Sequence, residues 1–102
     1  MISGVGVDIV DISRVDLKIS NKVLSSEELS LFKNMSEIRK KEFLAGRFAI
    51  KEALFKAGIK KRFSSLNVKY KEDNSIYLEN FPNVLLSISH EKEYAIGFVI
   101  VQ

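Results

Sequence analysis

The chain has 102 residues, of which 46% are hydrophobic and 28% charged, with one proline and no cysteine. These values predict one folded domain over residues 1–102 and exclude a disordered or fibrous protein, a disulfide framework and a cysteine-ligated zinc site. The net charge of +3 favours acidic or phosphorylated partners without requiring nucleic acid, and the single histidine excludes a multi-histidine metal site.

The N-terminal residues contain no basic leader followed by a long apolar region, and no run approaches the length of a membrane span. We therefore predict a soluble, cytosolic protein that does not bind membranes. A domain this small buries only a limited core, so its apolar content also predicts that another copy covers part of its surface.

The first predicted element is a strand over residues 2–10, in which Val5, Val7 and Ile9 alternate with Gly4, Gly6 and Asp8. The branched side chains then lie on one face, and Asp8 lies on a face that is otherwise bare backbone. A short helix follows and ends near Asn34. Its start is indicated by Ser25 and Glu28, which have the spacing of a capping box.

Residues 36–57 predict the longest helix, because they are rich in strong helix formers and Gly58 follows at a C-cap position. From Phe43 onward this helix is apolar on nearly every side yet carries four charges, at Arg47, Lys51, Glu52 and Lys56. Buried charges must be paired, reach solvent or bind something. One interpretation is that Glu52 pairs with Lys56 while Arg47 and Lys51 extend to solvent. The alternative is that these charges form a functional site, and the spacing of the residues does not decide between the two.

The second half of the chain predicts four strands, at 66–70, 75–79, 84–89 and 94–101, with a tight connection at 90–93. Helices between one leading strand and several trailing strands are typical of an α+β domain. We expect the long helix to pack on a mainly antiparallel sheet.

Two separated carboxylates, Asp8 and Glu52, together with several basic residues, suit a magnesium-phosphate site. Asp8 could instead cap a helical turn, as could Asp11. His90 could act with Ser87 or Ser89 as in a hydrolase, although no nucleophile elbow is present and a structural histidine is more common. The basic cluster 60–62 beside Phe63 leaves a small RNA-binding module as the competing function.

Three ordered blocks, GVGVDIVDISRV, FLAGRFAIKEALFKAG and LSISHEKEYAIGFVIV, resemble the holo-acyl-carrier-protein synthase family of small 4'-phosphopantetheinyl transferases. The resemblance implies the α+β fold of that family and a homotrimer with active sites between subunits. It also implies transfer of 4'-phosphopantetheine from coenzyme A to a serine of apo-acyl carrier protein, with release of 3',5'-ADP. Such an enzyme would depend on Mg²⁺, serve fatty acid biosynthesis and bind no nucleic acid.

By the same resemblance, Asp8 and Glu52 are the expected magnesium ligands, and Lys56 joins them as a catalytic residue. The resemblance does not choose the base, which could be a metal-bound water, Glu52 or an indirectly acting Asp8. The expected coenzyme A site consists of Arg47, Lys51, Lys56, Ser89 and His90. Arg14 matches the position at which the family docks the acidic helix of the carrier protein, and we expect Lys18 and Lys22 to extend that basic patch.

The segment after Gly58 is shorter and poorer in glycine than is usual in the family, and residues 72–78 lack the usual glycine and proline. The contacts to adenine and the 3'-phosphate are therefore the least defined part of the expected site. We expect Lys60, Lys61 or Arg62 to contribute there.

Overall fold

The computed structural model describes residues 1–102. Its strands and α-helices are β1 (Gly4–Asp11), α1 (Ser20–Val23), α2 (Ser26–Phe32), α3 (Glu37–Lys56), β2 (Val68–Tyr70), β3 (Ile76–Leu78), β4 (Val84–His90) and β5 (Tyr94–Val101). Single 3₁₀ turns lie at Ile12–Arg14, Leu17–Ile19 and Phe63–Ser65.

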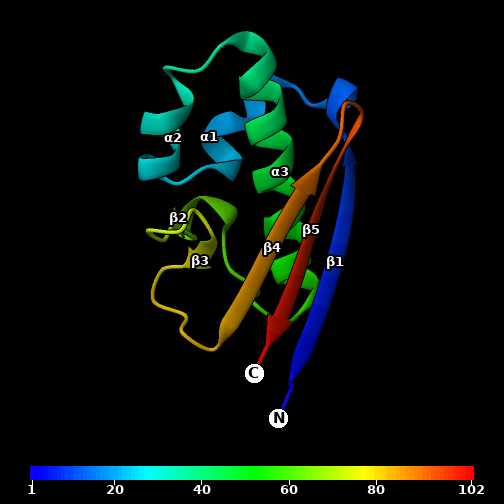
Figure 1. Ribbon diagram of the computed structural model, residues 1–102, viewed down its shortest axis with the longest axis vertical. Helices are drawn as coiled ribbons and strands as arrows, with labels where there is room; N and C mark the ends of the chain where they lie inside the picture. The colour runs from blue at the N-terminus through cyan, green and yellow to red at the C-terminus, as the bar shows by residue number, and fades with distance from the viewer.

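The main sheet has three antiparallel strands in the order β1-β5-β4, so β5 lies between the first strand of the chain and β4. Helix α3 packs along one face of this sheet, and the short pair β2-β3 forms a separate sheet beyond β4 (Figure 1). The predicted α+β fold, with a long helix on an antiparallel sheet, is confirmed.

Most of the predicted elements are present, with small differences at their ends. The capping box at Ser25 and Glu28 begins α2, and α3 ends two residues before Gly58. The strands β2 and β3 are shorter than predicted, and His90, predicted in a connection, is the last residue of β4. Helix α1 and the turns before it were not predicted, because residues 12–23 show no sustained period.

The close approach of β1 to α3 depends on Gly6. A Cβ atom at this position would lie 1.9 Å from the carbonyl oxygen of Ala53, so only glycine allows the strand to pass the helix backbone at this distance. Asp8 lies two residues further along the same face of β1, and Glu52 directly precedes Ala53. The packing at Gly6 therefore brings the two predicted metal ligands to neighbouring positions.

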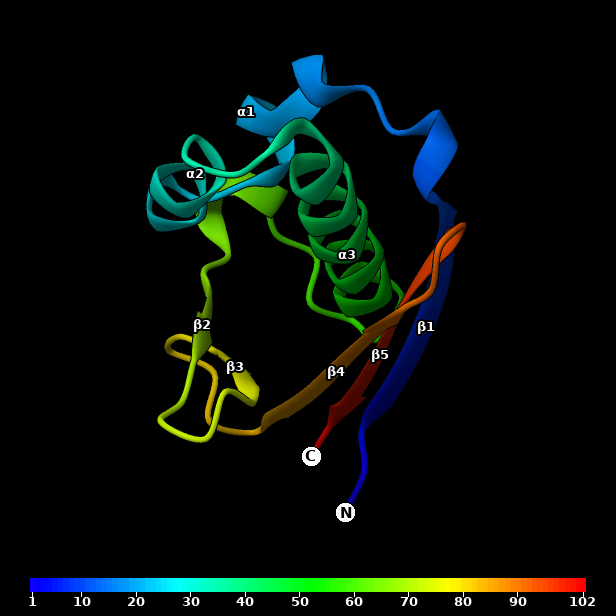
Figure 2. The ribbon, with the colours of Figure 1, turned by 45° about the horizontal axis from the view of Figure 1, so that its top comes forward.

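The other face of the main sheet carries no helix (Figure 2). It presents a set of exposed apolar side chains from all three strands, which we call the open sheet face: Val5, Val7, Ile9, Leu85, Ile96 and Phe98. A contiguous apolar surface of this kind is typical of a protein interaction site. None of the helices is both long and apolar enough to span a membrane.

Candidate active site

The largest cavity, of about 670 Å³, lies where the end of β1 meets α3 and the turns after β1. Asp8 and Glu52, the two predicted metal ligands, both line it. Asp11, Arg14 and Asp16 add further charges to the wall, and the remaining lining is largely apolar, with Phe48 and Tyr94 as its aromatic members. We call this space the carboxylate cavity.

Lys56 is paired with Asp8 rather than with Glu52. Its Nζ donates to Oδ1 of Asp8 at 3.0 Å and to the carbonyl oxygen of Val7 at 3.2 Å. The Lys56 side chain is 52% exposed, so its ammonium group can reach a ligand at the rim of the carboxylate cavity. Asp8 caps no helix; that role belongs to Asp11, which accepts from the N–H of Ser13.

Glu52 is half-buried, and no Lys or Arg nitrogen lies within ion-pair distance of its carboxylate. The alternative that Glu52 serves only as the i,i+4 partner of Lys56 is therefore wrong. A carboxylate that is partly removed from water without a cation is unfavourable unless a ligand compensates it. Its position on the same cavity wall as Asp8 makes a divalent cation a suitable ligand.

The donor set fits Mg²⁺ better than a metal held entirely by protein. No group of three or more His, Cys, Asp or Glu side chains converges on one point. Mg²⁺ commonly takes one or two carboxylates and completes its shell with water and substrate phosphate oxygens. Asp8 and Glu52 provide this minimal set, and the cavity beside them has room for a phosphorylated substrate.

The predicted docking residues lie beside this cavity or on the segment that follows it. Arg14 lines the cavity and its side chain is 87% exposed, with Nε 3.8 Å from Oδ2 of Asp11. The pKa of Asp11 is lowered, chiefly because the Ser13 hydroxyl donates to its carboxylate. Lys18 and Lys22 are exposed on the turn and helix that follow, outside the cavity lining.

A second cavity, of about 290 Å³, lies between α3, the β2-β3 pair and β4. Arg47 and His90 line it together, as expected for two residues of one binding site, and we call it the Arg47–His90 cavity. It shares no residue with the carboxylate cavity. Ser89 lines neither cavity; it is exposed and lies opposite Ile96 in the sheet.

The Arg47 guanidinium lies between two aromatic rings, 4.4 Å from the ring centre of Phe43 and 5.3 Å from that of Tyr70. The residue is only 4% exposed, yet neither Nε nor Nη2 makes a hydrogen bond. Nε is 3.2 Å from Oε2 of Glu28, which is an ion-pair distance although the N–H is not directed to hydrogen-bond that oxygen. Arg47 therefore lines a cavity while two of its guanidinium nitrogens, Nε and Nη2, are buried without a hydrogen bond.

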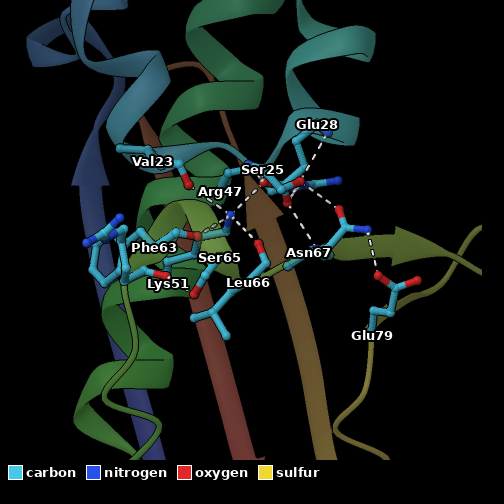
Figure 3. Close-up of polar contacts among 12 residues, drawn as sticks. Val23, Ser25, Glu28, Arg47, Lys51, Phe63, Ser65, Leu66, Asn67 and Glu79 are labelled. Carbon is cyan, nitrogen blue, oxygen red and sulfur yellow. Dashed lines mark hydrogen bonds and ion pairs between the residues drawn. The ribbon is translucent and has the colours of Figure 1, made fainter.

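Lys51 is placed in the interior and not at a ligand surface. It is 0% exposed, and its Nζ donates to Glu28 and to the carbonyl oxygens of Val23, Phe63 and Leu66 (Figure 3). Burial lowers its pKa, and the Glu28 carboxylate opposes that shift. The expectation that Lys51 contacts coenzyme A, and the alternative that it extends to solvent, both conflict with this burial.

Glu28 is the main residue that sequence reasoning missed. Its spacing from Ser25 identified it as a capping residue, and it does accept from the Ser25 N–H at 2.8 Å. The same carboxylate also meets Lys51, Arg47 and the N–H of Val68. The sequence did offer one signal. Arg47 and Lys51 lie in an apolar stretch of the helix, so their burial would require an acidic partner from another segment of the chain.

The cluster at residues 60–62 lines neither cavity. Lys60 lies over the ring of Phe55, with Nζ 5.3 Å from the ring centre. The ring of Phe63 packs edge-on against Phe48, at 6.1 Å between centres. Phe63 is therefore engaged within the fold, which counts against the RNA-binding interpretation because a base would need its free face.

The sequence model of the 4'-phosphopantetheinyl transferase superfamily matches residues 4–99. A holo-[acyl-carrier-protein] synthase of Mycoplasma capricolum is 41% identical over 106 residues, covering 100% of this chain and 96% of the relative. One from Geobacillus is 39% identical over 116 residues, covering 100% of this chain and 98% of the relative. The match defines the class of protein, a phosphopantetheinyl transferase.

Solved structures agree with the sequence relatives. A holo-(acyl-carrier-protein) synthase from Bacillus anthracis, crystallised in complex with CoA (3',5'-ADP), superposes with a TM-score of 0.89 at 34% identity, covering 99% of this chain and 96% of that one. One from Neisseria meningitidis gives a TM-score of 0.85 at 26% identity, covering 100% and 99%. The chain therefore belongs to the holo-acyl-carrier-protein synthase family and is an enzyme of that family.

Proposed function

We propose that this enzyme transfers the 4'-phosphopantetheine group of coenzyme A to a serine of apo-acyl carrier protein, with Mg²⁺ bound by Asp8 and Glu52. The observation that carries the proposal is that Asp8 and Glu52 line the same cavity and that Glu52 has no cation partner. Family membership supports the reaction, and the donor set supports the metal.

In the reaction, the serine hydroxyl oxygen attacks the β-phosphorus of coenzyme A. The bond from phosphorus to the bridging oxygen of the leaving 3',5'-ADP breaks, and a phosphodiester to the serine forms. The metal would supply charge neutralisation at the pyrophosphate. Lys56 adds a second positive charge at the cavity rim, since its exposed Nζ can exchange Asp8 for a phosphate oxygen.

The proton of the serine hydroxyl must pass to a base as the new bond forms. Asp8 and Glu52 are the two carboxylates nearest the expected chemistry, and either can act directly or through water. The cavity wall combines five charged side chains with six apolar ones, Phe48 and Tyr94 among them. Positioning and charge neutralisation therefore provide most of the rate in this proposal.

We infer that the acyl carrier protein docks over Arg14, with Lys18 and Lys22 extending the basic surface. Arg14 is almost fully exposed at the rim of the carboxylate cavity, where a carrier helix that bears acidic residues would have to approach. Replacing Arg14 by Glu should raise the KM for the carrier protein at least tenfold and leave the Kd for coenzyme A unchanged. An equal change in both constants would contradict this assignment.

Coenzyme A binding is assigned in this proposal to Arg47 and His90 as well as to Lys56. In one chain Arg47 and His90 line one cavity, toward the β4 edge of the main sheet, whereas Lys56 pairs with Asp8 of the other cavity, toward the β1 edge. A ring of copies would bring the β1 edge of one chain beside the β4 edge of the next. The open sheet face provides apolar surface for such contacts, which supports a homotrimer with active sites between subunits.

The first experiment is mass spectrometry of apo-acyl carrier protein after incubation with coenzyme A, Mg²⁺ and the enzyme. The carrier should gain one phosphopantetheine group, and EDTA or Glu52→Gln should abolish or strongly reduce the gain. Glu37→Gln is a matched control, since it removes the same charge from the first turn of the same helix. Full activity in EDTA, or no transfer to several carrier proteins by a folded enzyme, would contradict the proposal.

The cellular assignments follow from this reaction. A holo-acyl carrier protein is the form that carries acyl chains, so we place the enzyme in fatty acid biosynthesis. Location in the cytoplasm and organisation as one domain over residues 1–102 stay predictions. Fractionation of cells, and limited proteolysis of the purified chain, would test them.

A further inference from the structure

Glu28 is a buried acidic side chain that the proposed chemistry does not use. It is 1% exposed and lies on α2, where its carboxylate reaches the first residue of β2. Both oxygens are occupied: Oε1 accepts from the Ser25 N–H and from Lys51, and Oε2 accepts from the Val68 N–H at 3.1 Å and lies 3.2 Å from Arg47 Nε. Figure 3 shows this carboxylate between Arg47 and Lys51. A carboxylate removed from water is retained only where such partners compensate it.

The charges of this cluster do not cancel. Glu28 contributes one negative charge, while Lys51 and Arg47 each contribute one positive charge. The Lys51 ammonium group is fully used, because it donates to Glu28 and to three backbone carbonyls. The surplus positive charge therefore belongs to Arg47, whose Nε and Nη2 make no hydrogen bond.

The residue that carries the surplus charge lies beside a cavity. Arg47 lines the Arg47–His90 cavity, and the rings of Phe43 and Tyr70 hold its guanidinium from two sides. Glu28 is not among the residues that line this cavity. It can therefore influence a ligand there only through Arg47.

We propose that Glu28 is a positioning residue, which holds the Arg47 guanidinium so that its free edge receives an anionic group of coenzyme A. The inference rests on the proposed function for the identity of the ligand. Because the ion pair with Glu28 exists before any ligand binds, Arg47 loses little freedom on binding, and this lowers the Kd. Lys51 supports the arrangement by balancing the charge of Glu28.

A purely structural role would have different consequences. Glu28 also joins α2 to α3 and to β2, through Ser25, Lys51 and Val68. If it acted only in this way, its loss would lower stability and would affect the carrier protein and coenzyme A alike. A positioning role acts on coenzyme A alone and requires Arg47.

The test compares Glu28→Gln with Glu27→Gln. Glu27 is the exposed neighbour on α2, with an ion pair to Lys69 at 3.7 Å, and its variant should behave as wild type. Glu28→Gln should raise the KM and the calorimetric Kd for coenzyme A about tenfold, as for loss of one charge-assisted contact. The kcat at saturating coenzyme A and the KM for the carrier protein should stay within about twofold.

A double-mutant cycle decides whether Arg47 transmits the effect. In an Arg47→Gln background, Glu28→Gln should produce no further rise in the Kd for coenzyme A. The same tenfold rise in both backgrounds would overturn the proposal, as would an unchanged Kd in Glu28→Gln or an equal rise in the KM of both substrates.

A measurement on the wild-type enzyme covers the case in which Glu28→Gln does not fold. The ¹⁵Nε relaxation of Arg47 in the ligand-free enzyme should show a rigid side chain, whereas the exposed Arg62 should be mobile. Equal mobility would overturn the proposal. If the wild-type enzyme neither binds coenzyme A nor transfers its arm, the proposed function fails, and the relaxation of Arg47 still reports whether its side chain is ordered before a ligand binds.

Discussion

Gly6→Ala is expected to force β1 and α3 apart. The new Cβ would lie 1.9 Å from the carbonyl oxygen of Ala53 and 2.8 Å from its carbonyl carbon. Non-bonded atoms prefer about 3.5 Å, so strand or helix must move by more than about 1 Å. Both contacts are with backbone and cannot be relieved by a rotamer, which puts the cost near the upper end of the range for overpacking, about 3 kcal/mol.

The displacement reaches the site because both carboxylates are close to this contact in sequence. Asp8 is two residues from Gly6, and Glu52 is next to Ala53, so their separation changes with the gap between β1 and α3. A misplacement of about 1 Å can reduce a rate about a hundredfold. We expect the transfer rate to fall by that order, and the Tm at fixed protein concentration to fall by about 10–20 °C.

Gly58→Ala is the matched control. Gly58 has a φ of +107°, and no atom lies within 4 Å of a Cβ placed there, so the change strains the backbone without a steric clash. It should cost about 1–3 kcal/mol and leave the transfer rate near wild type well below the Tm. A Gly6→Ala enzyme with unchanged Tm and rate would refute the reasoning, as would an equal loss of rate in Gly58→Ala.

Three further predictions concern the core, the cavity and the open sheet face. Lys51→Met should lower the free energy of unfolding by about 3–5 kcal/mol in urea titrations, because Glu28 and three carbonyls lose their buried donor; a change below 1 kcal/mol would contradict its structural role. Asp11, with its lowered pKa, stabilises the fold fully above its unfolded pKa and loses this contribution as the pH falls through its folded pKa. Ser13→Ala should therefore raise the Asp11 pKa in NMR titrations and shift the acid loss of stability to higher pH, and an unchanged pKa would refute the assigned cause. Phe98→Lys, on the open sheet face, should convert trimers to monomers in sedimentation experiments, and a wild-type monomer would remove the basis of the assembly proposal.

The local pattern of the chain was enough to predict the elements that carry the carboxylate cavity. Alternation in residues 2–10 predicted β1 with Asp8 on the glycine face, and helix formers bounded by Gly58 predicted α3. Both predictions depend on interactions between near neighbours, which a sequence displays directly. Family resemblance then assigned Asp8 and Glu52 to a common ligand, and the structure places both on the same cavity wall.

The charged residues of α3 show where local reasoning ends. Lys51 and Glu52 are adjacent in sequence, but they are about 100° apart around the helix. Lys51 therefore enters the interior between α1, α2 and the turn at Phe63–Ser65, while Glu52 faces the carboxylate cavity. Periodicity measures the angle between them but does not say which segments cover each side.

By itself the sequence determined the order of helices and strands, the α+β class and the family. These depend on the spacing of neighbouring residues and on short sequence motifs, which can be recognised without a structure. Only the tertiary structure decided that Lys56 pairs with Asp8, that Lys51 is buried and that Glu28 holds Arg47. These pairings join segments that are distant along the chain: Lys51 is 23 residues from Glu28, and Lys56 is 48 residues from Asp8. The role of a charged side chain depends on which partners folding brings within a few ångströms of it, because electrostatic interactions weaken with distance. The order of residues in the chain does not specify those distances.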